Sequence, residues 1–420
     1  MADNKDKKVL NVPALRFPEF TEEWKRIRVS DLLDFYSTNS LSWEQLEYES
    51  NEPYNLHYGL IHVGLPTLVD LTKDKLPSIK EENVPKKYEL CKEGDVAFAD
   101  ASEDTNEVAK VVEFYNLDGK KVVCGLHTIH GRDNNKQTAK GFLGYCFSST
   151  VFHNQIRRIA QGTKIYSINT RNFSEVFVGL PSKSEQHKIA TLLRLIDEHI
   201  STQNKIIEKY ESLIQAMCDT LIERETQQVA LSFSDFGQSY SGLSGKNAED
   251  FGDGYPFITY MNVYQNQIID STDVGLVKIK ETEQQSVVRY GDILFTLSSE
   301  TPEEVGMGAV YLGETYPLYL NSFCFGIHIT DEAKIYSPFL AYYVSSQSFR
   351  KAVYPLAQGS TRFNLQKSDF MKKKFSFPMI EKQRKIYSIL NTYSDKLIVE
   401  KQIIGLLCSQ KRYLLRQLFI

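Results

Sequence analysis

Two stretches of the chain repeat apolar residues at alternating spacings of three and four positions, and each follows a proline, Pro181 or Pro378. This spacing is the a/d pattern of a heptad repeat, which predicts a long amphipathic helix with one apolar seam. The first seam comprises Leu193, Ile196, Ile200, Gln203, Ile207, Tyr210, Ile214, Met217 and Leu221. The second seam comprises Leu390, Tyr393, Leu397, Glu400, Ile404, Leu407, Lys411, Leu414 and Leu418.

We expect these helices to cover residues 183–225 and 380–420, each about 60 Å long at about 1.5 Å per residue. A helix of that length with an apolar stripe needs a partner, and the other helix can supply it. The two would pair as an antiparallel coiled coil. Gln203 and Glu400 occupy equivalent seam positions. They either fix the register of the pair or simply face solvent or a partner.

The rest of the chain is also duplicated, because many residues recur at an offset of 197 positions (291 − 94) without a gap. A repeat of this length means two domains of one fold rather than a solenoid. The matched residues include Gly94-Asp95 with Gly291-Asp292, Tyr58 with Tyr255, Ile61 with Ile258, Ser148-Ser149 with Ser345-Ser346, Gln161-Gly162 with Gln358-Gly359, and Gln186 with Gln383.

Within each copy, short apolar runs bounded by Gly-Asp turns predict strands, for example Val96-Ala97-Phe98. One helix is expected near Phe142 to Ile159 and its equivalent near Pro338 to Leu356. The expected fold class is therefore α+β. It comprises similar domains at 1–182 and 226–379, each followed by a long helix, with residues 1–12 a disordered polar lead.

Composition narrows the class of protein only slightly. A net charge of -4 gives no overall basic footprint for nucleic acid, but binding depends on local patches and a partner can supply charge. No apolar run reaches the roughly 18 residues that span a bilayer, so no membrane association is expected. The six cysteines are scattered without a CxxC pair, which indicates free thiols in a reducing cytoplasm.

One short loop in each copy combines glycine, hydroxyl, cation, aromatic and amide side chains. These types can approach and bond phosphate, pair with guanine through arginine, or pair with adenine through asparagine. The alternative is a surface turn entering a strand, with solvated cations and a core aromatic. The loops are Gln161-Gly162-Thr163-Lys164-Ile165-Tyr166-Ser167-Ile168-Asn169 and Gln358-Gly359-Ser360-Thr361-Arg362-Phe363-Asn364-Leu365.

The order of these features resembles the specificity subunits of type I restriction-modification enzymes. The resemblance rests first on the opening Val12-Pro13-Ala14-Leu15-Arg16-Phe17-Pro18-Glu19-Phe20 with Trp24. It also rests on the two Gly-Asp turns with their strands, and on the Gln-Gly-Thr/Ser loops that lead through Pro181 or Pro378 into helices. Glu185-Gln186-His187-Lys188-Ile189 opens the first helix, and Gly242-Leu243-Ser244-Gly245-Lys246 opens the second copy. The second helix departs from the pattern with Glu381-Lys382-Gln383.

The resemblance implies a non-catalytic reader of double-stranded DNA, with one target recognition domain for each half of a split, asymmetric site. It implies two modification subunits and restriction subunits as partners. S-adenosylmethionine, ATP and magnesium would be bound by those partners and no cofactor by this chain. The residues expected to bind DNA are Gly162, Thr163, Lys164, Tyr166, Asn169, Arg171, Lys246, Gly359, Ser360, Thr361, Arg362 and Asn364. The residues expected at the helix seam or a partner are Leu193, Ile196, Ile200, Ile207, Tyr210, Ile214, Leu390, Leu397, Ile404 and Leu407.

Motifs for catalysis or metal binding are not found in the sequence. Asn247 follows Lys246 where a P-loop has Ser or Thr, so this stretch is either a plain turn or a phosphate contact through Lys246. His127 and His130 have no cysteine or acidic partner at ligand spacing, so ordinary structural histidines are favoured over a metal site. Two other classes remain open: a coiled-coil scaffold that spaces two proteins, and an enzyme with an unrecognised active site.

Overall fold

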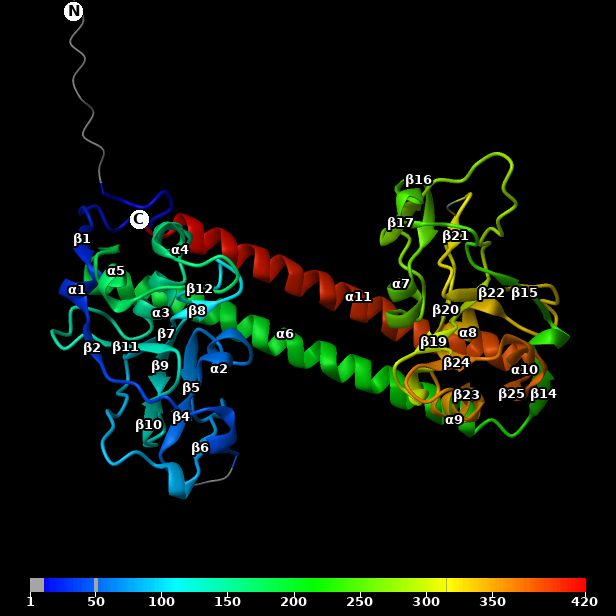
Figure 1. The fold of residues 1–420 in the computed structure, drawn as a ribbon, viewed down its shortest axis with the longest axis horizontal. Helices are drawn as coiled ribbons and strands as arrows, with labels where there is room; N and C mark the ends of the chain where they lie inside the picture. The colour runs from blue at the N-terminus through cyan, green and yellow to red at the C-terminus, as the bar shows by residue number, and fades with distance from the viewer. Residues whose placement is uncertain (1–10, 49–51, 315) are drawn as a thin grey trace, which may run out of the picture. The chain divides into compact units, whose positions relative to one another are not determined.

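The computed structural model describes residues 11–48, 52–314 and 316–420 (Figure 1). The chain forms two compact units. Unit 1 comprises Met1–Asn204 with Gln402–Ile420, and unit 2 comprises Lys205–Lys401. Each unit therefore contains one copy of the repeat together with part of both long helices, whereas the sequence suggested domains that end where the helices begin.

The two long helices are α6 (Lys183–Glu223) and α11 (Ile380–Gln417). In unit 2, Glu211 pairs with Lys401 at 2.7 Å, and Glu225, just past α6, pairs with Lys382 at 3.2 Å. The partner number falls as the α6 number rises, so the two segments run antiparallel there. In unit 1, Asp197 pairs with Lys411 at 2.6 Å. The predicted antiparallel helix pair is thus confirmed within the units.

Burial along the seams is greatest next to the globular parts. Leu193 and Leu390 are completely buried, and each belongs to the core of its own unit. Ile196 and Ile214 are buried as well. Gln203, Leu414 and Leu418 are also buried. The half-buried seam residues include Ile200, Ile207, Tyr210, Leu397, Ile404 and Leu407.

One glutamine fixes the entry of each long helix. The Gln186 side-chain oxygen accepts from Ala139 N at 2.7 Å, and its amide donates to Pro181 O at 2.9 Å. In unit 2, Gln383 accepts from Tyr336 N at 2.9 Å and donates to Pro378 O at 2.8 Å. Both glutamines are buried, so the repeated Gln is explained by backbone groups that would otherwise lack partners.

Within the described part of unit 1, the largest sheet has the strand order β2-β11-β7-β9-β5, antiparallel except for the parallel pair of β5 and β9. Its strands are β2 (Asp34–Tyr36), β11 (Thr128–Arg132), β7 (Val96–Ala99), β9 (Val111–Asn116) and β5 (Leu68–Asp70). A second sheet comprises β10 (Val122–Cys124), β4 (Tyr54–Leu56), β6 (Ser78–Ile79) and β3 (Leu46–Glu47). Two small pairs are β1 (Lys25–Arg28) with β13 (Phe177–Leu180) and β8 (Ala101–Ser102) with β12 (Tyr166–Ser167).

Unit 2 repeats this plan. One sheet has the order β15 (Gly237–Ser241), β22 (Cys324–Ile329), β18 (Ile293–Thr296) and β20 (Gly308–Val310), and a second has the order β17 (Val274–Val277), β16 (Phe251–Ile258) and β21 (Tyr319–Leu320). A third sheet pairs β14 (Gln228–Ser232) with β25 (Lys374–Pro378). A fourth has the order β19 (Ser298–Ser299), β24 (Phe363–Leu365) and β23 (Ala357–Gln358).

Shorter helices connect these strands. Unit 1 has α1 (Val29–Leu32), α2 (Tyr58–His62), α3 (Phe142–Phe147), α4 (Thr150–Ile159), α5 (Thr170–Ser174), η1 (Trp43–Gln45) and η2 (Glu81–Asn83). Unit 2 has α7 (Tyr260–Gln265), α8 (Ser337–Tyr343), α9 (Gln347–Val353), α10 (Lys367–Lys372), η3 (Phe233–Asp235), η4 (Ala248–Asp250), η5 (Pro302–Glu304) and η6 (Tyr354–Leu356).

The predicted single helix after the central strands is wrong in both copies, because the first helix ends early and a serine caps the start of a second one. Ser149 caps α4 by accepting from Phe152 N, and Ser346 caps α9 by accepting from Phe349 N, both at 3.3 Å. Serine is a preferred N-cap because its hydroxyl satisfies a free backbone donor. The repeated Ser-Ser pair is therefore a helix boundary.

The single offset of 197 does not hold throughout the repeat. Tyr58 begins α2 and Tyr260 begins α7, so this pair differs by 202 positions, and the match of Tyr58 with Tyr255 is wrong. His130 faces Ala97 across the sheet while Gly326 faces Leu294, so β11 and β22 differ by 196. Short insertions in the connections explain both changes of register, because the strands themselves align.

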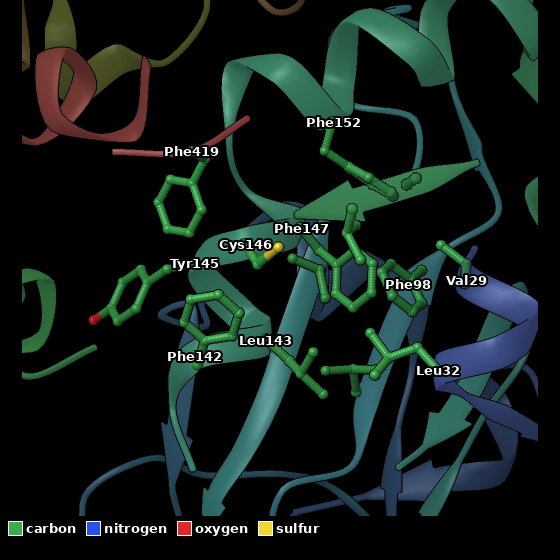
Figure 2. Close-up of a cluster of buried hydrophobic side chains, with 14 of the residues drawn as sticks. Val29, Leu32, Phe98, Phe142, Leu143, Tyr145, Cys146, Phe147, Phe152 and Phe419 are labelled. Atoms are coloured by element: carbon green, nitrogen blue, oxygen red, sulfur yellow. The ribbon is translucent and has the colours of Figure 1, made fainter. Parts of the chain in front are cut away.

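The core of unit 1 packs aromatic side chains from the sheet and its helices against the end of the chain (Figure 2). Phe98 contacts Phe147 edge-on, with ring centroids 4.9 Å apart, and Phe142 lies 5.9 Å from Phe419. The expected disorder of residues 1–12 is wrong for Asn11, whose carbonyl accepts from Trp24 N at 2.8 Å. Residues 1–10 lie outside the described residues.

Candidate nucleic-acid interface

The two loops singled out in the sequence are built on the same frame. In unit 1, Gln161 and Ser167 form a bridge, and β12 pairs with β8. In unit 2, Gln358 pairs with Asn364, and β24 pairs with β19. Each loop therefore turns over four residues between two paired positions and returns as a strand, which holds its tip at a fixed place in its unit.

A glycine at the start of each tip makes this turn possible. Gly162 has a φ of 142° and Gly359 a φ of 135°, both in the region that favours glycine. A Cβ on Gly162 would lie 1.9 Å from Ile165 O, and one on Gly359 would lie 2.1 Å from Arg362 O. The same two constraints thus act at both positions, and neither loop tolerates a side chain there.

The side chains at the tips are largely exposed. In unit 1, Thr163, Lys164, Asn169 and Arg171 are exposed and Tyr166 is half-buried; in unit 2, Ser360, Thr361, Arg362 and Asn364 are exposed. Within the described residues, no hydrogen bond or ion pair engages Lys164, Arg171 or Arg362. These cations are therefore free to meet an anion such as a phosphate.

Two of the predicted DNA-binding residues form contacts within their own unit. The Asn169 side chain accepts from Asn172 N at 2.8 Å and caps α5. The Lys246 ammonium donates to Lys278 O at 2.6 Å and pairs with Glu283, and its side chain is only 4% exposed. Lys246 is therefore not accessible to a phosphate, because the chain folds over it.

Beside the second loop lies a cavity of about 330 Å³. Its rim carries apolar and aromatic groups, of which Phe323 is 58% and Met261 is 46% exposed. Tyr260 donates to Ser298 O at 2.7 Å, and its ring stacks on Tyr264 at 5.9 Å. The cavity is lined by Tyr260, Met261, Tyr264, Ser298, Ser299, Glu300, Glu304, Phe323 and Arg362.

Tyr264 and Glu304 form the polar side of this cavity. The Tyr264 hydroxyl donates to Glu304 Oε1 at 2.6 Å. This bond raises the pKa of Tyr264 to about 12 and lowers the pKa of Glu304. The phenol is therefore neutral and the carboxylate ionised at neutral pH, so the cavity offers an acceptor carboxylate next to the Arg362 cation.

At the equivalent face of unit 1 the side chains differ. The structural equivalences place Tyr58 at Tyr260, His62 at Tyr264, His127 at Phe323 and Ile165 at Arg362. His62 Nε2 lies 3.0 Å from Ala101 O, and His127 Nδ1 lies 3.1 Å from Asp100 Oδ1. The two units thus share a frame and present unlike surfaces.

The residues predicted from the sequence do not include the exposed apolar and aromatic side chains beside the second loop. Met261 lies in α7 and Phe323 in the turn before β22, and only the fold brings them next to Arg362. The Asn321 side chain accepts from Phe323 N at 2.9 Å and orders the turn before β22. No local motif marks these positions, because their proximity depends on strand order.

A second group of side chains corrects the statement that His130 lacks a cysteine or acidic partner. Its imidazole bonds Asp95 at 2.7 Å. Among the described residues, the donor atoms of Cys91, Cys124 and His130 lie within 4.8 Å of one another, and all three are buried. The sequence separation hid this group, because three different segments of the sheets supply it.

The comparisons with known proteins agree with this arrangement. The family model described as the type I restriction modification DNA specificity domain matches residues 21–212 and 235–407. The specificity subunit of the type I restriction enzyme EcoKI from Escherichia coli K12 is 23% identical over 185 residues, which cover 40% of this chain and 39% of that protein. The match thus spans well under half of that relative's length.

Solved structures show the same fold. The S subunit of a type I restriction-modification system from M. genitalium aligns with a TM-score of 0.53 at 17% identity, covering 97% of this chain and 99% of that one. A chain from a structure concerned with complex assembly and conformational transition of the type I system aligns with a TM-score of 0.58 at 15% identity. The alignment covers 93% of this chain and 96% of that one.

Among the described residues, no helix is long and apolar enough to cross a bilayer.

Proposed function

Because this chain belongs to the type I restriction-modification DNA specificity family, we propose that it reads a split, asymmetric DNA site, one half with each unit. The observation that carries the proposal is the pair of equivalent loops with unlike tips. Gly162 and Gly359 shape the same turn, while Lys164-Ile165 and Thr361-Arg362 differ at its tip. A shared frame with different contact residues is what two different half-sites require.

Contacts at the loops divide into two kinds. Lys164 and Arg171 are exposed cations in unit 1 and would bind phosphate, which positions the protein without selecting sequence. Arg362 stands beside the aromatic cavity of unit 2, where its planar fork would pair with guanine in the major groove. Phe323 and Met261 would contact the methyl group of thymine or a base edge.

The long helices would carry the partners of this subunit. Several of their apolar side chains face outward instead of into the helix pair: Ile398 is 54% exposed, Val399 52% and Leu406 72%. Exposed apolar groups of this kind mark protein interaction sites. We assign them to two modification subunits, to which restriction subunits are added, and the methyl donor, ATP and magnesium belong to those partners. The compartment that fits this role is the cytoplasm.

The test is a binding selection with the full chain and its modification subunits against random duplexes. The expected result is a motif of two specified blocks separated by an unspecified gap of fixed length. Arg362→Ala should relax the preference in one block only, while Lys164→Ala should weaken all duplexes alike. If the complex shows no sequence preference, the scaffold alternative gains and the proposal fails.

A further inference from the structure

The buried thiols of Cys91 and Cys124 meet between the two sheets of unit 1. Cys91 lies in the segment before β7, where its N–H donates to Val122 O at 2.8 Å, and Cys124 ends β10. Their sulfur atoms are 3.5 Å apart. Two thiolates on a tetrahedral zinc ion, with bonds of about 2.3 Å, stand roughly 3.8 Å apart, so this spacing needs little adjustment to hold a metal.

His130 is held with one nitrogen engaged and the other free. Its Nε2 bonds Asp95 Oδ2 at 2.7 Å, and Arg132 fixes the same carboxylate through two hydrogen bonds of 2.8 Å. Its Nδ1 is buried and has no hydrogen-bond partner among the described residues. The whole imidazole is 0% exposed. A buried, unpartnered ring nitrogen costs free energy unless something binds it.

We propose that Cys91, Cys124 and His130 bind one zinc ion through the two sulfur atoms and Nδ1. Asp95 then acts as the carboxylate that orients a ligating histidine, a recurring arrangement around zinc. Binding releases the two thiol protons to solvent. The two thiolates neutralise the dication, and Asp95 neutralises Arg132, so the assembly carries no net charge, as an apolar core requires. A water molecule completes the tetrahedron.

Unit 2 shows that this fold does not need these side chains. At the positions equivalent to Cys91 and Cys124 stand Val288 and Leu320, both buried in one apolar cluster. Gly326 replaces His130, and the ring of Tyr240 fills the space, with its hydroxyl donating to Asp292 at 2.8 Å. The two cysteine positions are therefore apolar in unit 2 and a tyrosine ring fills the histidine position, so packing alone does not explain two cysteines and a histidine in unit 1.

The zinc ion would tie three segments of unit 1 together. The stretch between η2 and β7 contains no strand among its described residues, and Cys91 would anchor it to β10 and β11. Because Cys91, Cys124 and His130 are all buried, a substrate could not reach the ion, so the site points to a structural role. Structural zinc contributes directly to folding.

The experiment measures metal content in the full chain purified without chelator or metal-affinity resin. One zinc per chain is expected by elemental mass spectrometry. After the metal is removed under reducing conditions, cobalt(II) should produce thiolate charge-transfer absorption and tetrahedral visible bands. Cys91→Ala, Cys124→Ala and His130→Ala should each lose the stoichiometric metal.

Matched variants separate loss of metal from loss of fold. The double variant Cys91→Val with Cys124→Leu copies the pair found in unit 2 and should fold without metal. A chelator should lower the melting temperature of the unchanged chain and leave that of the double variant the same. Cys408→Ser changes an exposed cysteine and should retain the metal. Absence of stoichiometric zinc with no uptake of cobalt, or a mass showing a Cys91–Cys124 disulfide in the isolated chain, would overturn the proposal.

Discussion

Arg16 and Glu185 form a two-bond ion pair at the start of the first long helix. The Arg16 guanidinium donates to both carboxylate oxygens, at 2.7 and 2.8 Å, and Trp24 Nε1 adds a third bond at 3.2 Å. Glu185 is 1% exposed and Arg16 13%. The pairing raises the pKa of Arg16 and ties the first segment of the chain to α6. This explains why Arg16, Trp24 and Glu185 occur together.

Glu185→Ala should destabilise unit 1 by about 3 kcal/mol, because it leaves a mostly buried guanidinium without its counterion. Lys382 occupies the equivalent position of α11 and forms an ion pair with Glu225. The Lys382 side chain is 51% exposed. Lys382→Ala is the matched control and should change the free energy of unfolding by less than about 1 kcal/mol. Urea unfolding compares the two variants, and equal losses would contradict this account.

Glu113 should make unit 1 less stable as the pH rises from 4.5 to about 7. It is buried, and burial raises its pKa from 4.5 to about 7, although Gly141 N and Gly144 N donate to it. The carboxyl is neutral in both folded and unfolded chains below pH 4.5 and is ionised in both above pH 7. Its contribution to stability is therefore complete at low pH and is lost between these values, by about 3 kcal/mol.

The control is Glu113→Gln, which cannot ionise. It should be less stable than the unchanged chain near pH 5, because one of the two N–H groups loses its acceptor. The difference should shift in favour of the variant as the pH rises toward 8. Unfolding free energies of both proteins across this range test the sign, and parallel curves would rule out Glu113 as the cause.

The duplication, the long helices and the two loops could be predicted because each is written in local sequence. Heptad spacing marks a helix wherever it packs, and Gln-Gly marks a turn that needs a positive φ at the glycine. The register of the repeat was less predictable. Insertions move Tyr260 five positions away from the residue matched to Tyr58 (202 − 197), and no periodicity reveals them.

Sites that join distant segments escaped prediction altogether. Cys91, Cys124 and His130 follow no ligand spacing, because the strand order rather than the chain brings them together. The reverse error occurred at Lys246, which a glycine-rich turn made look exposed. In the structure Lys278 and Glu283 engage its ammonium. Burial of a long polar side chain depends on the folding of remote loops over it.

Arg362→Ala should weaken binding to duplexes whose second block carries the preferred base. The expected loss of binding free energy is about 1 to 3 kcal/mol, on the order of tenfold to a hundredfold in affinity. Duplexes altered at that base should be bound equally by both proteins. Lys164→Ala should instead lower affinity for all duplexes and reduce the slope of log affinity against log salt by about 1. Titrations at several salt concentrations separate these outcomes, and a uniform loss for Arg362→Ala would reassign it to phosphate.

Gly162→Ala and Gly359→Ala should each disable one half of the recognition site. The added methyl group meets a carbonyl oxygen at 1.9 or 2.1 Å, in a backbone region that side chains rarely adopt, so the tip of the loop must rearrange. Gly64 and Gly252 also have positive φ, at 114° and 101°, but no atom lies within 4 Å of their added Cβ. Gly64→Ala in unit 1 and Gly252→Ala in unit 2 are therefore controls, because each introduces backbone strain without a clash. Binding selections should show one block of the motif weakened by Gly162→Ala and the other by Gly359→Ala, with both blocks kept in the controls. Loss of the same block in both loop variants would show that the loops do not read separate half-sites.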